Sequence, residues 1–197
     1  MATLSTEGLE NLKKNYQWVA EKCVEMHNSF VTPLEESKGR AVIFMGSASD
    51  MPHCNKISKL ANELGYNCEK HISSAHKSTE AVLKLLAKLE SESLTRPTCI
   101  IAVAGRSNGL GPVLSGNTCI PVINCPPLSG TYASQDVWSS LRLPSGLGCS
   151  TVLTPDAAAY SAAQVLCQQD FTIWCRLRAR QLNTWIDLRL QDSSIQK

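Results

Sequence analysis

A buried strand that runs directly into a glycine-rich polar turn constrains this chain more than any other feature. Residues 99–103 are apolar and rich in branched side chains, which predicts a strand buried on both faces. The next nine residues, 104–112, read AGRSNGLGP. Glycine has no Cβ, so the N–H groups of such a turn can approach a ligand, and a helix that starts there adds an anion site. A tight connection between strand and helix that binds nothing is the alternative explanation.

The end of an earlier strand carries a similar polar cluster. Residues 41–45 are apolar and predict a strand that leads into an amphipathic helix. The turn between them holds a glycine, two hydroxyl groups and an acid: Gly46, Ser47, Ser49 and Asp50. One of these side chains is expected to cap the helix. The cluster as a whole would suit a phosphate, with Asp50 on a sugar hydroxyl.

A third polar cluster follows a shorter strand expected over residues 65–72. It contains Ser74, His76 and Lys77. His76 lies at a strand end and can change its charge near neutral pH, which makes it a candidate acid or base. We interpret His27 and His53, in contrast, as ordinary solvated residues.

The remaining sequence continues the alternation of strands and helices. We expect strands over 119–124 and 149–153, a proline-rich turn after residue 124, and helices over 135–141, 155–168 and 171–190. Five alternating strands predict an α/β fold of flavodoxin-like type: three αβα layers around an approximately parallel five-stranded sheet. Residues 1–38 are interpreted as an N-terminal helix, from Thr6 to about His27, followed by a linker. The main domain is therefore placed at 39–197.

Composition argues against several functional classes. A net charge of +2 without a basic stripe gives no reason to expect a nucleic-acid or anionic-membrane partner. No apolar run approaches the roughly 20 residues that span a bilayer. The N-terminus lacks the layout of a signal peptide. The nine cysteines are odd in number and have no C-x-x-C spacing. They predict reduced thiols in a cytosolic protein, and no zinc site.

Four motifs together resemble the aminoimidazole ribonucleotide (AIR) carboxylase family of purine biosynthesis. They are GSASD at 46–50, SAHK at 74–77, AGRSNGLGP at 104–112 and DVWSSL at 136–141. The similarity covers residues 40 to about 190, in order. It is greatest to the animal form, usually the C-terminal half of a bifunctional enzyme that also carries SAICAR synthetase. Residues 12–21 resemble the last helix of that synthetase. Because the rest of it is not in this sequence, we expect no ATP-dependent ligase activity, and a SAICAR synthetase domain is a candidate partner.

The resemblance also distinguishes two classes of the family. The bacterial and plant class is a mutase that moves a carboxylate from the ring amine to the ring carbon, and its turn reads roughly AGGAAH. The corresponding residues 104–109 contain no histidine, and the bacterial SAHR is SAHK at 74–77. Both differences favour the class that takes carbon dioxide directly. The mutase is kept as an alternative, as is a non-catalytic nucleotide-binding or scaffolding module, because flavodoxin-like folds host many functions.

The resemblance implies reversible carboxylation of AIR by carbon dioxide to 4-carboxy-5-aminoimidazole ribonucleotide (CAIR), without biotin, ATP or metal. His76 is the expected proton shuttle. Ser47, Ser49, Ser74 and Lys77 are expected to hold the ribose phosphate, beside Gly46, and Asp50 a ribose hydroxyl. The carboxylate or carbon dioxide would face the third turn, where Arg106, Ser107 and the N–H groups of 107–109 are fixed donors. The substrate-binding residues of this turn are Gly105, Arg106, Ser107, Asn108 and Gly109.

A homo-octamer with active sites at subunit contacts is also implied by the resemblance. The last helix carries Trp174, Leu177, Trp185 and Leu188, and the 155–168 helix is rich in alanine. A monomer that exposed these faces would carry an apolar patch that symmetric association removes. The alternative is that both helices complete the layers of the monomer.

Overall fold

The computed structural model describes residues 37–128 and 133–196, together with Glu10, Lys14 and Gln17. Ser37–Trp174 form one compact unit, and the chain from Cys175 onward belongs to a second. The predicted helix from Thr6 to about His27 lies outside the described residues, apart from three isolated positions that are helical. The predicted domain boundary after residue 38 stays a prediction.

The sheet has five strands, as the sequence predicted. They are β1 (Arg40–Met45), β2 (Asn67–Ile72), β3 (Thr98–Val103), β4 (Val122–Asn124) and β5 (Ser150–Thr151). All neighbours are parallel, and their order is β2-β1-β3-β4-β5. This is the flavodoxin-like order, in which the chain reverses its direction of winding between β1 and β3. β4 is shorter than predicted and begins only after Pro121, which has no N–H to donate.

Helices connect the strands and cover the sheet. They are the short 3₁₀ helix η1 (Ala48–Asp50), α2 (Met51–Leu64), α3 (Thr79–Ser93), α4 (Leu110–Ser115), α5 (Ala133–Asp136), α6 (Trp138–Leu141), α7 (Pro155–Leu166) and α8 (Phe171–Ile195). The single helix predicted over 135–141 is two short ones, and the last helix ends later than predicted. None of the described helices is long and apolar enough to cross a membrane.

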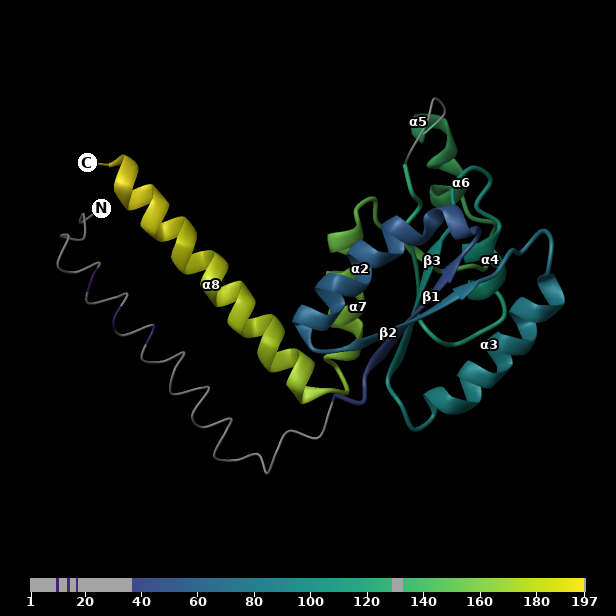
Figure 1. The fold of residues 1–197 in the computed structure, drawn as a ribbon, viewed down its shortest axis with the longest axis horizontal. Coiled ribbons are helices and arrows are strands. Elements are labelled where there is room, and N and C mark those ends of the chain that lie inside the picture. The colour runs from purple at the N-terminus through teal and green to yellow at the C-terminus, as the bar shows by residue number, and fades with distance from the viewer. Residues whose placement is uncertain (1–9, 11–13, 15–16, 18–36, 129–132, 197) are drawn as a thin grey trace. The chain divides into compact units, whose positions relative to one another are not determined.

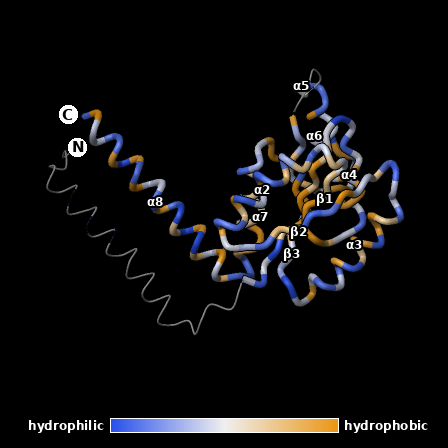
Figure 2. The backbone as a smooth tube through the Cα atoms, in the orientation of Figure 1, coloured by the Kyte–Doolittle hydropathy of each residue, from blue (hydrophilic) through white to orange (hydrophobic). Residues whose placement is uncertain are grey.

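Each face of the sheet packs against its own pair of helices. Val42 and Phe44 of β1 lie in one apolar cluster with residues of α3 and α4. On the other face, α2 and α7 lie side by side (Figure 1). The tube coloured by hydropathy shows the apolar residues gathered on the strands, inside these layers (Figure 2). The three-layer arrangement is therefore the predicted one.

The alanines of α7 pack against other elements of the same compact unit. Ala158, Ala159, Ala162 and Ala163 have no exposed surface, and α7 packs against α2 and β3. Close packing inside one chain explains these small side chains. For these four residues the structure shows the alternative, in which the helix completes the layers of the monomer.

A buried carboxylate joins the start of the sheet to the start of α8. Oδ2 of Asp170 accepts hydrogen bonds from Ser37 Oγ at 2.7 Å and from Gly39 N at 3.1 Å. Oδ1 accepts from the N–H groups of Thr172 and Ile173 in the first turn of the helix. Burial raises the pKa of Asp170, but these hydrogen bonds outweigh it and leave the pKa below its usual value. Asp170 is thus both a helix cap and a clamp on the segment that enters β1.

We predict that Asp170→Asn lowers the free energy of unfolding by about 1–3 kcal/mol, because an amide places a donor where a carboxylate oxygen accepted. The depressed pKa also fixes the sign of the pH dependence. The stabilisation is present above the unfolded-state pKa of about 3.9 and is lost as the pH falls through the folded-state pKa. Denaturant unfolding of both proteins from neutral to acidic pH measures this. Parallel acid profiles for parent and variant would contradict the assignment.

Candidate active site

Three polar turns lie together because three strands end in register. Met45, the last residue of β1, pairs with Ile72 of β2 and with Val103 of β3. The backbone continues this contact, since Gly46 N donates to Val103 O and Ser73 N donates to Met45 O. The carboxyl edge of a parallel sheet beside the point where winding reverses is where such folds bind ligands. The three predicted clusters therefore meet at one edge.

The turn after β1 is organised by a reciprocal cap. Ser47 Oγ accepts from Ser49 N at 3.3 Å, and the Ser47 N–H donates to Asp50 Oδ2 at 3.1 Å. The two serine hydroxyls also bond to each other at 3.0 Å. Burial raises the pKa of Asp50, and the hydrogen bond from Ser47 partly offsets this. The predicted capping role is thus confirmed, while both serines stay exposed.

The turn after β2 presents His76 and Lys77 to solvent. Its backbone is closed by Ser78 N and Lys77 N, which both donate to Ser74 O. The side chains of Ser74, His76 and Lys77 make no hydrogen bond or ion pair with any other described residue. They are available to a ligand at the sheet edge.

The turn after β3 uses two of its backbone N–H groups within the protein. Asn108 N donates to Ser139 Oγ at 3.0 Å, and Gly109 N donates to Ser107 O at 2.9 Å. Of the three N–H groups expected to face a carboxylate, only that of Ser107 has no partner among the described residues. The N–H groups of Asn108 and Gly109 are thus hydrogen-bonded within the protein, and the assignment of these two residues to the substrate stays a prediction. Arg106 adopts a left-handed conformation with φ 54°, which costs an L-residue about 1–2 kcal/mol.

A buried polar network holds this turn in place. The Asn108 side chain is 3% exposed, and its Nδ2 donates to Ser140 Oγ at 2.9 Å and to Asn124 Oδ1 at 3.2 Å. Ser139 Oγ accepts from Asn108 N and lies 2.7 Å from Arg106 O, so it bridges the backbone on both sides of Ser107. Asn108 therefore anchors the turn, and its contact with substrate stays a prediction.

Sequence reasoning missed Asn124, Ser139 and Ser140 as parts of this network. Asn124 ends an otherwise apolar strand and is fully buried. A polar residue at the end of an apolar strand is a sequence signal that could have identified Asn124. The two serines lie in the 136–141 motif, but nothing local indicates that they reach residues 31 and 32 positions away.

The glycines of the turn make room for other parts of the protein. A Cβ on Gly111 would lie 1.8 Å from Asn124 Oδ1, and one on Gly109 would lie 2.7 Å from His76 Nε2. Gly105 is less crowded, with Pro127 the nearest neighbour at 3.6 Å. The absent side chains of Gly109 and Gly111 therefore leave room for His76 and Asn124, and close approach of a ligand to this turn stays a prediction.

His53 is not the solvated residue that the sequence suggested. It is half-buried, and its Nε2 lies 3.2 Å from Cys125 Sγ. Burial, with a contribution from Lys56, lowers the pKa of His53, and burial raises that of Cys125 to about 12. The pair is therefore neutral and not a thiolate nucleophile. Within the described ranges, no three His, Cys, Asp or Glu side chains gather closely enough to hold a metal ion.

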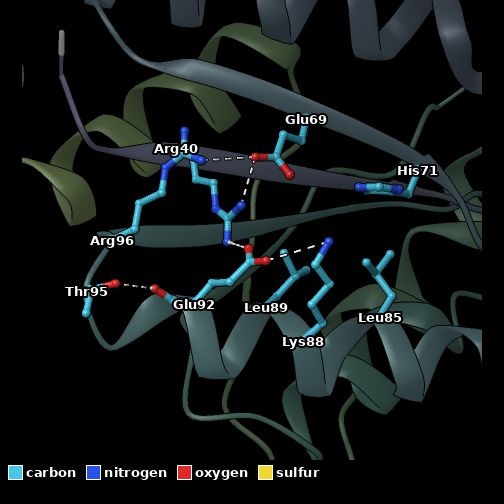
Figure 3. A pocket seen from close by; sticks show the side chains of 9 residues that line it. All are labelled: Arg40, Glu69, His71, Leu85, Lys88, Leu89, Glu92, Thr95 and Arg96. Atoms are coloured by element: carbon cyan, nitrogen blue, oxygen red, sulfur yellow. Dashed lines mark hydrogen bonds and ion pairs between the residues drawn. The ribbon is translucent and has the colours of Figure 1, made fainter.

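A hollow of about 410 Å³ lies elsewhere, against β2 and α3 (Figure 3). Its charged groups satisfy one another. The Arg40 guanidinium is bonded to Glu69 at 2.8 Å and to Glu92 at 2.6 Å, and Arg96 also contacts Glu69. At the strand-end edge, by contrast, the cationic side chains of Lys77 and Arg106 have no ion-pair partner among the described residues. The edge, and not this hollow, is the better candidate for an anionic ligand.

We predict that Gly111→Ala lowers the free energy of unfolding by about 1–3 kcal/mol, because the new methyl group overpacks the Asn124 amide. That amide is fully buried and hydrogen-bonded, so it has little room to move. Thermal or denaturant unfolding measures the change. Gly148→Ala is the matched control, since no atom of the described residues lies within 4 Å of its added methyl group. Equal stability of the two variants would contradict the packing assigned to Gly111.

Comparison with known proteins identifies the family. The family model described as AIR carboxylase matches residues 40–185. The chain is 50% identical over 194 residues to the human bifunctional phosphoribosylaminoimidazole carboxylase/phosphoribosylaminoimidazole succinocarboxamide synthetase, covering 98% of this chain and 44% of the human protein. It is 42% identical over 129 residues to phosphoribosylaminoimidazole carboxylase of Treponema denticola, covering 66% of this chain and 80% of that protein.

The fold agrees with these similarities. The crystal structure of Treponema denticola PurE matches with a TM-score of 0.75 at 35% identity, covering 81% of this chain and 99% of that one. The family model spans all three polar turns, and the sheet that aligns them has the fold of a solved relative. The chain belongs to the AIR carboxylase family.

Proposed function

We propose that this chain catalyses the reversible carboxylation of AIR by carbon dioxide to CAIR, a step of purine biosynthesis. One observation carries the proposal: His76, from the turn after β2, lies against Gly109 in the turn after β3. The proposed acid–base group thus lies at the edge where the turn after β1 offers two exposed serines. A nucleotide-binding module would need those turns but no titratable group between them.

The proposed chemistry uses the electron-rich ring of the substrate. The ring carbon of the aminoimidazole attacks carbon dioxide, so a carbon–carbon bond forms and one C=O π pair moves to oxygen as a carboxylate. The resulting cation still carries the ring proton at the attacked carbon. Neutral His76 takes that proton, the C–H electron pair restores the aromatic ring, and the imidazolium later releases the proton to solvent.

The ribose phosphate is assigned to the first two turns. Ser47, Ser49 and Ser74 supply hydroxyl donors, and exposed Lys77 supplies a cation without an ion-pair partner in the described residues. Asp50 is assigned to a ribose hydroxyl. Its Oδ2 accepts a hydrogen bond from Ser47 N. Gly46 lies beside this carboxylate: a Cβ added to it would be 3.9 Å from Asp50 Oδ2.

The carboxylate side of the substrate is assigned to the third turn. Arg106 and Ser107 are exposed there, and their side chains have no partner among the described residues. The Ser107 N–H is the remaining backbone donor. Fixed donors of this kind stabilise the negative charge that develops on carbon dioxide. Because carbon dioxide offers little surface to bind, orientation beside the nucleophile must supply much of the rate.

We also propose that the reaction needs no ATP, biotin or metal, because the substrate ring is itself the nucleophile. The chain spans 44% of its human relative, whose name includes a succinocarboxamide synthetase. A SAICAR synthetase domain is accordingly the proposed partner in a longer protein. A cytosolic location agrees with the eight described cysteines, all of which are free thiols.

We predict that His76→Asn lowers turnover by about two to four orders of magnitude, because the proton at the ring carbon loses its acceptor. The fold and the affinity for AIR should change little, since His76 is exposed and has no hydrogen bond to another described residue. The assay is CAIR formation from AIR and bicarbonate, with and without ATP. Activity within a few-fold of the parent would assign the base to another residue.

The same assay separates the two classes of the family. Product should form at equal rates with and without ATP, and carbonic anhydrase should change only the approach to equilibrium with bicarbonate. A protein that accepted only the carboxyamino form of the substrate would be a mutase, and the assignment of Arg106 and Ser107 to carbon dioxide would then be wrong.

We propose a homo-octamer as the working assembly and predict a mass near eight times 21.5 kDa by light scattering. Phe171 and Trp174 support association. Their rings stack with centroids 5.6 Å apart, yet the two residues stay 71% and 44% exposed. Aromatic residues are enriched at protein–protein interfaces. An active monomer of 21.5 kDa would contradict this proposal.

A further inference from the structure

We propose that Gly109 is the positioning residue for His76: its missing side chain leaves the space that the imidazole occupies. The inference rests on the proposed function, in which His76 transfers the proton. It assigns to Gly109 a role other than the contact with substrate that its place in a glycine-rich turn suggested.

The contact between the two residues is closer than any side chain at position 109 would allow. A Cβ on Gly109 would lie 2.7 Å from Nε2 of His76, 2.9 Å from Cε1 and 3.6 Å from Cδ2. Separations below 3.0 Å are essentially never found for a real Cβ. All three nearest atoms belong to the imidazole, and the nearest is a ring nitrogen. A methyl group at position 109 and the present ring position are therefore incompatible.

The backbone gives no other reason for a glycine here. Gly109 has φ −78° and ψ −16°, which any residue can adopt. Gly65 and Gly146, in contrast, have φ near 88°. The N–H of Gly109 is also donated to Ser107 O, so it is not reserved for a ligand. The feature of glycine that the structure uses at position 109 is therefore the absence of a side chain.

An alanine at position 109 should move the imidazole rather than the turn. The turn is anchored by Asn108, whose buried side chain bonds to Ser140 and Asn124. His76 is exposed, and its ring has no hydrogen bond to another described residue. The ring can therefore rotate toward solvent, while the fold stays intact.

The displacement matters because proton transfer depends on distance. A base must reach hydrogen-bond range of the proton that it takes, and a misplacement of about 1 Å can cost about 100-fold in rate. Groups assigned to the ribose phosphate lie on the other two turns and should keep their positions. The variant should consequently lose turnover while it keeps its affinity for AIR.

The test is Gly109→Ala in the full chain, with Gly148→Ala as the matched control. We expect Gly109→Ala to lower kcat by about 10- to 100-fold, with the dissociation constant of AIR within about twofold of the parent. The thermal midpoint should equal or exceed that of the parent, because alanine replaces glycine at an allowed backbone conformation. The imidazole NMR signal of His76 should shift. Gly148→Ala should change none of these quantities, because its methyl group meets no atom within 4 Å in the part of the chain that the structure describes.

A second background tests whether the effect passes through His76. An asparagine at position 76 has no atom in the places of Nε2 and Cε1, so a methyl group at 109 displaces nothing. Adding Gly109→Ala to His76→Asn should change the residual rate by less than about twofold. Non-additivity of this kind supports a positioning role.

Three results would overturn the proposal: an unshifted His76 signal with unchanged kcat, weakened AIR binding in both backgrounds, or a lowered thermal midpoint. The second would mean that Gly109 shapes the substrate site directly. Failure of the proposed function is recognised separately. If His76→Asn kept full turnover, the proton transfer would belong elsewhere, whereas the NMR signal in Gly109→Ala would still decide whether the two residues meet.

Discussion

The pairing of β1 with β2 on one side and β3 on the other is the constraint on which the site depends. Met45, Ile72 and Val103 are aligned in the sheet, so all three strands end at the same level. The residues that follow these strands therefore lie at the same edge of the sheet. Polar groups separated by long stretches of sequence are thereby brought together, and no long-range polar contact is needed to collect them. A shift of one residue in either pairing would reverse the faces of a strand and separate the turns.

The turns are held by different means, and this determines what each can offer a ligand. The turn after β1 caps its own helix through Ser47 and Asp50. The turn after β3 is fixed from outside, by Asn108, Asn124 and the serines of α6. Its left-handed Arg106 is held by the same network, through Ser139. The exposed groups therefore stand on turns that are held by hydrogen bonds within the protein, and such fixed positions are the pre-organisation that a binding site requires.

The sequence was sufficient for the fold class, the five strands and the three strand-end clusters, because apolar periodicity and turn residues are local signals. The same local signals do not show which residues lie against the glycines of the third turn. Gly109 and Gly111 accommodate His76 and Asn124, residues that the sequence places 33 and 13 positions away. His53 was misjudged for the same reason, since its partner Cys125 lies 72 positions later. Which groups meet across turns depends on tertiary packing that no local pattern records.

The two ends of the sheet divide the charged residues between stability and binding. Arg40, at the start of β1, is 3% exposed and is matched by Glu69 and Glu92, so its charge is spent within the fold. Lys77 and Arg106, at the opposite ends of their neighbouring strands, have no such partners in the described residues. An ion-paired cation is already neutralised and gains little from an anionic ligand, whereas an exposed one gains a partner on binding. This difference in pairing, more than the volume of any hollow, favours the strand-end edge as the candidate site for an anionic ligand, and His76 and Gly109 meet at that same edge.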